Sequence, residues 1–364
     1  MCRSNKYLFG FSVIVLLLAG CSPRVATSFW RIGTPADSTK EGYRVIYAEG
    51  KTRHCFPVTT WIDDFPSLQM EDCLDLAIRT AGAAGSVAPT RTDRGRPDTY
   101  HSLHHHGVAV ESELMAYRIY FDKKQTIDPY CKRTPQLELA TSFWYPNDSL
   151  LAAGFGDDIL RVSGTVGVGS VKYWNGQKHT HIEPVSQRSQ RIVRQTRNSA
   201  TIEVAVQDWQ VEDKNIDMQV QYTMLAGHRD LRCDVFLSQP VEGLCTGVQS
   251  IPAKKLPNDS LWLCEELENG VLLASWGTDW PVNDSAKYAK ETVGLAVFIP
   301  NKYAGARVRD KQNNLCLLQQ SAAGNQYSAH FYLTCCGATK ENQPVATNAT
   351  DWYIYVRRWA AKLR

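Results

Sequence analysis

The chain has 364 residues, of which 43% are hydrophobic and 21% charged, and its formal net charge is +3. This composition is typical of a globular protein, and the length suffices for one large domain or two smaller ones. So small a net charge gives no reason to expect a nucleic-acid partner or electrostatic binding to an acidic membrane surface.

The N-terminus predicts export. Two basic residues precede an apolar run over Tyr7–Ala19, which has the length of a signal peptide and is too short to span a bilayer. The run leads into Leu-Ala-Gly-Cys, which resembles a bacterial lipobox. We therefore expect a lipoprotein signal peptide over residues 1–20 and lipidation of Cys21, with an ordinary secretory signal as the alternative. The lipid would anchor the protein to a membrane, namely the outer membrane at its periplasmic face or the cell surface.

Nine cysteines follow Cys21. Disulfides persist in exported proteins, and an odd number leaves at least one thiol free. The adjacent pair Cys335 and Cys336 would point to opposite sides of a strand, so no bond between them is expected. The alternative is a set of buried free thiols that pack as small hydrophobic groups.

Three segments are expected after the signal peptide. Residues 21–40 are polar and predict a tether, and residues 41–99 predict an N-terminal extension of the fold that includes a helix over Met70–Thr80. Residues 100–364 predict the main domain, in which β-type patterns dominate. The candidate strands are 108–121, 158–163, 165–172, 189–197, 200–208, 216–226, 231–238, 271–276, 292–299, 315–319 and 328–334.

Turn signals separate these strands. Asn175-Gly176 and Asn269-Gly270 are strong hairpin signals. The apolar spacing over Thr350–Leu363 predicts a terminal amphipathic helix. The fold class we expect is mainly β, a large antiparallel β-sandwich with a C-terminal helix.

The stretch Tyr100–Lys132 holds the densest group of side chains that can move protons. If residues 108–121 form one strand, Glu111, Glu113 and Tyr117 share one face, with Arg118 on the other. In a cleft, desolvation and mutual repulsion would raise the pKa of one glutamate, which could act as an acid while the other acts as a base. A charged pair on a solvated strand is the alternative.

Elimination from a uronic acid is a second possible reaction. Arg118 would neutralise the sugar carboxylate, and Tyr117 or a histidine such as His106 would remove the proton. Tyr120 would protonate the leaving oxygen. A regular strand places Arg118 and Tyr117 on opposite faces, so this mechanism requires a β-bulge.

Aromatic and polar residues elsewhere suggest contacts with a sugar, because flat apolar rings stack on sugar faces. The predicted substrate-binding residues are His104, Tyr120, Asp158, Trp174 and Trp276. Further candidate platforms are Trp144, Tyr145 and Trp280. The histidines at 101 and 104–106 raise the possibility of a metal, but no metal-specific spacing accompanies them, and neither a metal nor a cofactor is predicted.

The motif H-H-H-G-V-A-V-E-S-E-L-M-A-Y-R-I-Y-F-D-K-K-Q-T-I-D-P-Y-C-K resembles the signature of an uncharacterised bacterial family, the domain of unknown function numbered 4861. Later landmarks are also similar, namely Gly156–Val162, the glycine-rich turn over 164–169, Ala226–Arg229 and Trp276-Gly277. The resemblance covers roughly residues 100–364. It departs at Cys131, where the family usually has glycine, which puts a tight backbone there in question. The family resemblance implies a galactose-mutarotase-like supersandwich and, by analogy, exported proteins of polysaccharide breakdown.

Three functions are consistent with the sequence. The first is an enzyme that cleaves glycosidic bonds in oligosaccharides or polysaccharides, by hydrolysis or by β-elimination. The second is a non-catalytic glycan-binding lipoprotein of a polysaccharide-utilisation system. The third is a structural envelope protein without a sugar ligand. In the first two, the partners are an oligosaccharide and, through the N-terminal lipid, a membrane.

Overall fold

A computed structural model describes residues 59–61, 105–142, 145–195, 198–252, 259–283 and 285–363. The predicted signal peptide, Cys21, the tether, the helix over Met70–Thr80, His104 and Trp144 lie outside the described residues. The strands of the described residues pair antiparallel throughout, which confirms the prediction of a mainly β sandwich with a C-terminal helix. Within the same ranges, no helix is long and apolar enough to cross a membrane.

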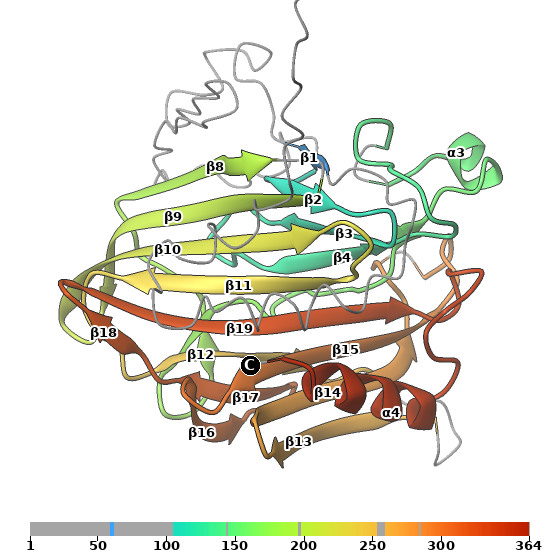
Figure 1. Ribbon diagram of the computed structural model, residues 1–364. Coiled ribbons are helices and arrows are strands. Elements are labelled where there is room, and N and C mark those ends of the chain that lie inside the picture. The colour runs from blue at the N-terminus through green and yellow to red at the C-terminus, as the bar shows by residue number, and fades with distance from the viewer. Residues whose placement is uncertain are drawn as a thin grey trace, which may run out of the picture.

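The largest layer is a nine-stranded sheet, the large sheet, which faces the viewer in Figure 1. Its strands, in the order in which they pair, are β13 (Leu261–Leu267), β14 (Gly270–Asp279), β15 (Glu291–Pro300), β19 (Gln326–Gly337), β11 (Asp230–Leu237), β10 (Lys214–Leu225), β9 (Ser199–Val211) and β8 (Gln187–Gln195), with β18 (Ser321–Ala323) beside β19. The turn between β13 and β14 holds Asn269, so that hairpin prediction is confirmed.

Two smaller sheets lie behind the large sheet in Figure 1. The first small sheet contains β1 (Thr59–Trp61), β2 (Ala109–Glu111), β3 (Met115–Ile119), β4 (Ile127–Cys131) and β5 (Asp157–Asp158). The second small sheet contains β16 (Ala304–Arg309), β17 (Asn313–Leu318), β12 (Leu244–Gln249), β6 (Lys172–Trp174) and β7 (His179–Thr180). The hairpin between β6 and β7 contains Asn175-Gly176, as predicted.

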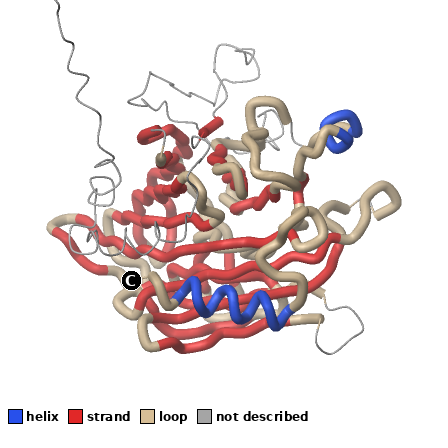
Figure 2. The backbone as a smooth tube through the Cα atoms, turned by 45° about the vertical axis from the view of Figure 1, so that its right-hand side comes forward, coloured by secondary structure: helices blue, strands red, loops and turns tan. Residues whose placement is uncertain are grey.

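Apolar side chains fill the space between the layers. Val204 and Leu333 from the large sheet belong to one buried cluster with Tyr117 and Ile127 from the first small sheet. The helix α4 (Ala349–Ala360) packs on the outer face of the large sheet over β14 and β15 (Figure 2). A shorter helix, α3 (Asp148–Ala152), lies at the periphery. Burial of both faces explains why β14 and β15 are almost continuously apolar.

The helix α4 forms where the apolar spacing predicted it. The side chain of Asn348 accepts a hydrogen bond from the backbone N–H of Asp351, which satisfies a donor in the first helical turn. Trp352, Val356 and Trp359 then recur at helical spacing and are buried against the large sheet.

The strand predicted over 108–121 is a hairpin, and this corrects the assignment of its faces. The chain reverses at Ser112, whose N–H donates to the carbonyl of Met115 and whose hydroxyl donates to the carbonyl of His228. In the resulting register Glu111 lies opposite Ala116. Glu111 therefore shares a face with Arg118, whereas Tyr117 points to the opposite side.

Two other strand predictions were too long. The predicted strand 158–163 contributes only Asp158 to β5, and 165–172 contributes only Lys172 to β6. Gly167 and Gly169 interrupt the second run with φ angles of 59° and 69°, which L-residues with a side chain rarely adopt. The strands β4, β7, β12, β13, β16 and β18 were not predicted.

The backbone around Cys131 is tight although the residue is not glycine. A Cβ built on Gly156 would lie 1.7 Å from the carbonyl oxygen of Cys131, and one built on Gly337 would lie 2.7 Å from its sulfur. Gly156 thus leaves room for the backbone of Cys131, and Gly337 leaves room for its side chain. All seven described cysteines are free and six of them are buried, so at these positions the free-thiol alternative is confirmed.

Candidate functional site

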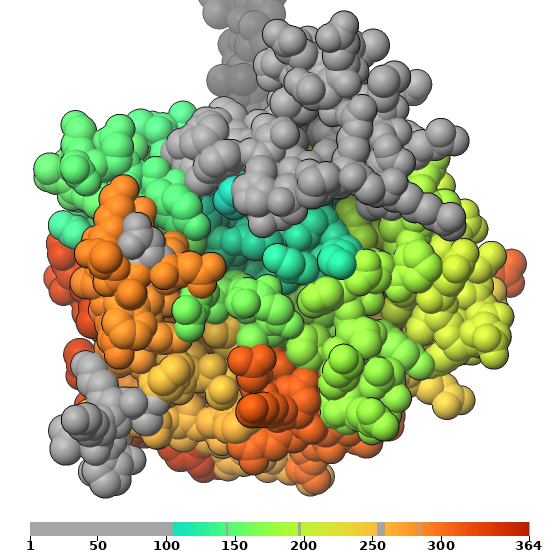
Figure 3. Space-filling model, turned by 180° about the vertical axis from the view of Figure 1, so that it is seen from behind, coloured from blue at the N-terminus to red at the C-terminus, as the bar shows by residue number. Residues whose placement is uncertain are grey.

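The outer face of the first small sheet is polar although it is buried. Arg118 lies opposite Asp128 in the β3–β4 register, and Tyr130 lies opposite Asp158 in the β4–β5 register, so these four side chains point the same way. In Figure 3, which shows the molecule from behind, residues of this sheet (teal) lie at the centre of the visible face. Buried polar groups need hydrogen-bond partners, and the contacts of these side chains show how far that need is met.

Arg118 is held between two aspartates. Its Nη2 donates to Oδ2 of Asp128 at 2.5 Å and to Oδ2 of Asp158 at 3.0 Å. Two oxygens that contact one nitrogen at these distances can be at most about 5.5 Å apart. Arg118 is 1% exposed, Asp128 0% and Asp158 3%. We refer to Arg118, Tyr120, Asp128 and Asp158 as the Arg118 cluster.

Burial and mutual repulsion shift the two carboxyl groups of this cluster in the same direction. Burial, followed by the negative charge of Asp128, raises the pKa of Asp158 well above its ordinary value, although Arg118 opposes the shift. Burial also raises the pKa of Asp128, with Arg118 again acting in the opposite direction. Two close carboxyl groups beside one guanidinium favour a state in which one holds a proton and the other is ionised.

Tyrosines surround the Arg118 cluster and connect it to the surface. The hydroxyl of Tyr120 donates to Oδ2 of Asp128 at 3.0 Å. The guanidinium carbon of Arg118 lies 5.9 Å from the ring centroid of Tyr145, a residue that is 37% exposed. The ring of Tyr145 is in turn 6.2 Å from that of Tyr288. A partly exposed aromatic pair therefore lies next to the buried Arg118 cluster.

One polar atom of the cluster lacks a partner. Oδ1 of Asp128 is buried and accepts no hydrogen bond from any described residue. A buried acceptor without a donor is costly, and such atoms are commonly satisfied by a water molecule or a ligand. No three metal-ligating side chains converge within the described ranges.

Glu111 lies on the same face as Arg118 but belongs to a different group of contacts. It pairs with Lys132, and its carboxylate accepts hydrogen bonds from the backbone N–H groups of Glu138 and Leu139 at 2.9–3.1 Å. Glu111 thus fastens the loop that follows β4 onto the sheet.

We expect Glu111→Gln to lower the free energy of unfolding by about 2 kcal/mol, because the amide keeps the size of the side chain but loses the charge opposite Lys132. Denaturant unfolding measures this change. The control Glu266→Gln, at an exposed pair with Arg307, should change stability by less than about 0.5 kcal/mol. If Glu111→Gln kept its stability but lost all catalytic activity, Glu111 would have a catalytic role instead of a structural one.

The remaining predicted catalytic residues do not converge with Glu111. Glu113 lies in the β2–β3 turn, where its Oε2 accepts the backbone N–H of Gly227 at 3.1 Å. The hydroxyl of Tyr117 donates to the carbonyl of Arg229 inside the sandwich, and the tyrosine is 0% exposed. His106 is buried, with its ring centroid 5.4 Å from that of Tyr120. The predicted Glu111–Glu113–Tyr117 face is therefore wrong, because the hairpin separates its members.

The predicted platforms differ in their accessibility. Trp276 is 1% exposed and packs against Trp352 beneath α4, so it cannot stack on a sugar. Trp174 on β6 is half-buried, as is Trp280, whose ring lies 4.0 Å from Nζ of Lys290. Of these aromatic residues and Tyr145, only Tyr145 contacts the Arg118 cluster within the described residues.

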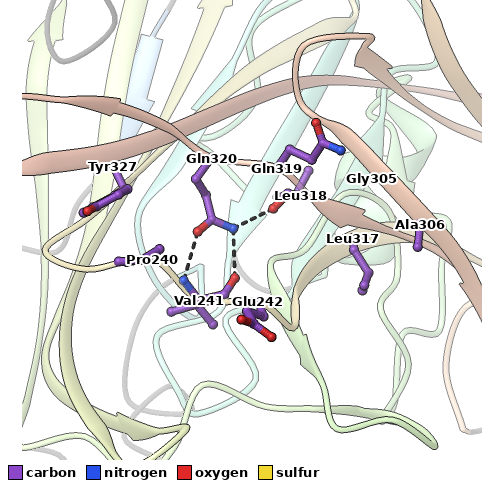
Figure 4. Close-up of a pocket in the computed structure, with 10 residues that line it drawn as sticks. All are labelled: Pro240, Val241, Glu242, Gly305, Ala306, Leu317, Leu318, Gln319, Gln320 and Tyr327. Atoms are coloured by element: carbon purple, nitrogen blue, oxygen red, sulfur yellow. Dashed lines mark hydrogen bonds between the residues drawn. The ribbon is translucent and has the colours of Figure 1, made fainter.

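A hollow with a volume of about 510 Å³ lies beside the second small sheet (Figure 4). The amide of Gln320 closes one side of it through hydrogen bonds with the backbone of Val241. The titratable side chains that line the hollow are Glu242 and Tyr327. Because the lining of this hollow has only one carboxyl group, the hollow is a poorer candidate for catalysis than the Arg118 cluster, which has two.

The sequence profile of a family described as Domain of unknown function (DUF4861) matches residues 79–364. The chain belongs to this family. The match begins before residue 100, where the similar motifs start. No curated protein matches the chain. The DUF4861 description carries no reaction, so the geometry of the site is the basis for any functional assignment.

Two DUF4861 motifs supply the Arg118 cluster. The pattern A-Y-R-x-Y contributes Arg118 and Tyr120, and I-D-x-Y contributes Asp128. Arg118, Tyr120 and Asp158 were predicted from the sequence as site residues, whereas no role was predicted for Asp128. The signal that could have identified Asp128 is its position within the motif, since an acid inside an otherwise apolar strand needs a buried partner.

Proposed function

We propose that this protein is a lipid-anchored, exported enzyme that hydrolyses glycosidic bonds in neutral oligosaccharides at the Arg118 cluster. One observation carries the proposal: Asp128 and Asp158 share Nη2 of Arg118, at 2.5 Å and 3.0 Å. Glycoside hydrolysis needs two such carboxyl groups, one protonated and one ionised.

The roles follow from the surroundings of each carboxyl group. Asp158, whose pKa is raised by burial and by the charge of Asp128, protonates the leaving oxygen. Asp128 remains ionised because Arg118 and Tyr120 both donate to it, and its unpartnered Oδ1 is the oxygen left to attack the sugar carbon. A separation of at most about 5.5 Å favours a retaining mechanism, in which Asp128 forms a covalent glycosyl intermediate.

Hydrolysis is favoured over β-elimination. A lyase needs a cation that neutralises the uronate, but Arg118 already contacts two carboxylates. It also needs a base, and the predicted candidate Tyr117 points to the opposite face from Arg118, where burial raises its pKa well above the ordinary value and keeps it protonated. A neutral sugar avoids both difficulties.

A non-catalytic glycan-binding role is the second candidate. The observation that favours it is the pair of partly exposed rings, Tyr145 and Tyr288, with centroids 6.2 Å apart. Aromatic rings at a surface stack on sugar faces without any chemistry. Under this alternative, substitution of Asp128 or Asp158 would leave glycan affinity unchanged, and no bond would be cleaved.

A panel of neutral and acidic oligosaccharides distinguishes these functions. New reducing ends without ultraviolet absorbance from an unsaturated uronate are the expected result with the neutral members. Binding measured by calorimetry, with no new ends across the panel, would favour the binding protein. Absorbance together with new ends would replace hydrolysis by elimination.

The rate of hydrolysis should follow a bell-shaped pH profile. As the pH rises through the raised pKa of Asp158, the acid is lost and kcat falls. As the pH falls, Asp128 becomes protonated and kcat falls again. The ordinary pKa of aspartate is about 4, and both aspartates here have raised pKa values. Both the rise and the fall of the profile should therefore occur at higher pH than two ordinary aspartates would give. A rate that stays constant from pH 4 to pH 9 would contradict these roles.

A further inference from the structure

A second group of buried charges lies where the three sheets meet, near the 122–126 loop between β3 and β4. Lys172 on β6 is 0% exposed, and Arg188 on the edge strand β8 is 1% exposed. Fully buried cations are rare unless they are paired with an acid. Within the described residues, neither Lys172 nor Arg188 has a carboxylate within ion-pair distance. Their placement therefore requires a partner.

The contacts of the two cations leave donors unsatisfied. Nζ of Lys172 donates to the carbonyl of Lys124 and lies 3.4 Å from both the Thr126 hydroxyl and Nδ1 of His181. Nη2 of Arg188 donates to the carbonyl of Ile182 at 2.9 Å. Nε and Nη1 of Arg188 are buried and have no partner among the described residues. An unpartnered guanidinium in the interior carries a large desolvation cost.

Neighbouring amides repeat this pattern. Gln125 lies between the two loop residues that contact Lys172, and both polar atoms of its buried side chain lack partners within the described ranges. Gln190 follows Arg188 on the same face of β8. Its Oε1 accepts the backbone N–H of Val108 at 2.8 Å, whereas its Nε2 lacks a described partner. Unsatisfied donors thus outnumber acceptors in this region.

The local charge is positive. Asp122 attracts both cations, yet its Oδ1 accepts the backbone N–H groups of Lys124 and Gln125 instead of contacting either of them. The other acid that acts on Arg188 is Glu183, which is 45% exposed and pairs with Lys123 at 3.4 Å. Lys172 and Arg188 against the remaining acid, Asp122, therefore leave a surplus of positive charge. A monovalent anion would balance it.

We propose that Lys172 and Arg188 form a binding site for a small carboxylate, which accepts the unpartnered N–H donors of Arg188 and an N–H of the Lys172 ammonium group. A carboxylate is monovalent, and its oxygens match guanidinium donors better than a spherical halide does. The site makes no contact with Arg118, Asp128 or Asp158 within the described residues, and it is independent of the proposed hydrolysis.

The protonation of Lys172 couples to the anion. Burial, together with the positive charge of Arg188, lowers the pKa of Lys172 to about 7. The titratable and charged groups that face Lys172 are Asp122, Lys124, His181, Arg188 and Cys245. A bound carboxylate favours the charged form of Lys172. Above about pH 7, where the free amine is largely neutral, binding therefore requires Lys172 to take up a proton, and affinity should weaken as the pH rises.

Thermal unfolding of the full chain in acetate tests this site. Acetate is titrated at constant ionic strength against chloride, in a buffer whose own anion is a bulky sulfonate. The wild-type protein should show a saturable rise in melting temperature. Arg188→Gln should raise the half-saturating acetate concentration at least about tenfold. Without acetate, this variant should be as stable as the wild type or more so, because it removes a buried unpaired charge.

Two further variants complete the test. Arg307→Gln makes the same substitution at a half-exposed surface arginine and should leave the acetate response unchanged. Lys172→Met provides a second loss of charge at the site if Arg188→Gln fails to fold. The proposal is overturned if acetate gives the wild type no saturable stabilisation, if chloride stabilises it equally, or if both site variants respond to acetate as the wild type does.

Discussion

Asp158→Asn should lower kcat for glycoside hydrolysis by 10²- to 10⁴-fold, with KM almost unchanged. The amide cannot give up a proton to the leaving oxygen, and general acid catalysis contributes a factor of this size. The fold should survive, because the amide oxygen can still accept the backbone N–H of Leu160, which contacts Oδ1 of Asp158 at 3.0 Å. Steady-state kinetics on the best substrate of the oligosaccharide panel measures the change.

Asp157→Asn is the matched control, since Asp157 is the preceding residue and just as buried. Its side chain points away from Arg118 and lies 3.4 Å from Nζ of Lys340. This variant should lose some stability while kcat stays within about threefold of the wild-type value, since mutations away from the reacting atoms leave transition-state stabilisation intact. Equal losses of kcat in the two variants would mean that Asp158 is not the general acid.

Arg118→Met should lower the free energy of unfolding by about 3–5 kcal/mol at neutral pH, because it leaves Asp128 and Asp158 buried without their cation. Without Arg118, the folded-state pKa of each aspartate rises further above its unfolded value. The folded state then binds more protons than the unfolded state, so the deficit should shrink as the pH falls from 8 to 5. Denaturant unfolding at several pH values measures both effects.

Arg161→Met provides the comparison for this loss. Arg161 is 40% exposed and pairs with Asp279 at 3.2 Å, so its removal should cost less than about 1 kcal/mol. A deficit in Arg118→Met that does not depend on pH would mean that the two aspartates are not the source of the instability.

Sequence reasoning succeeded where the signal is local. The long strands β15 and β19 could be predicted because apolar and β-branched residues fill most of their length, and β9 and β10 because apolar residues alternate with polar ones. The helix α4 could be predicted because its tryptophans and Val356 recur at helical spacing. The hairpin at Ser112 could not be predicted. It depends on a hydrogen bond to the carbonyl of His228, which lies 116 residues away.

The same limit explains which site residues were found. Arg118, Tyr120 and Asp158 stood out as polar residues in apolar surroundings, but their grouping with Asp128 depends on the pairing of β3, β4 and β5. A register is set by turns and by long-range packing, and a shift of one residue reverses every face. The assumption of one unbroken strand therefore placed Glu111 with Tyr117 instead of with Arg118.

Hydrolysis by the wild-type protein in oxygen-18 water tests the central claim most directly. Mass spectrometry of the products from a neutral oligosaccharide should show one oxygen-18 atom at the new reducing end, with no unsaturated product, because water completes the reaction that Asp128 and Asp158 begin. Products with a double bond and no oxygen-18, or an intact oligosaccharide across the whole panel, would contradict the assignment of a hydrolase.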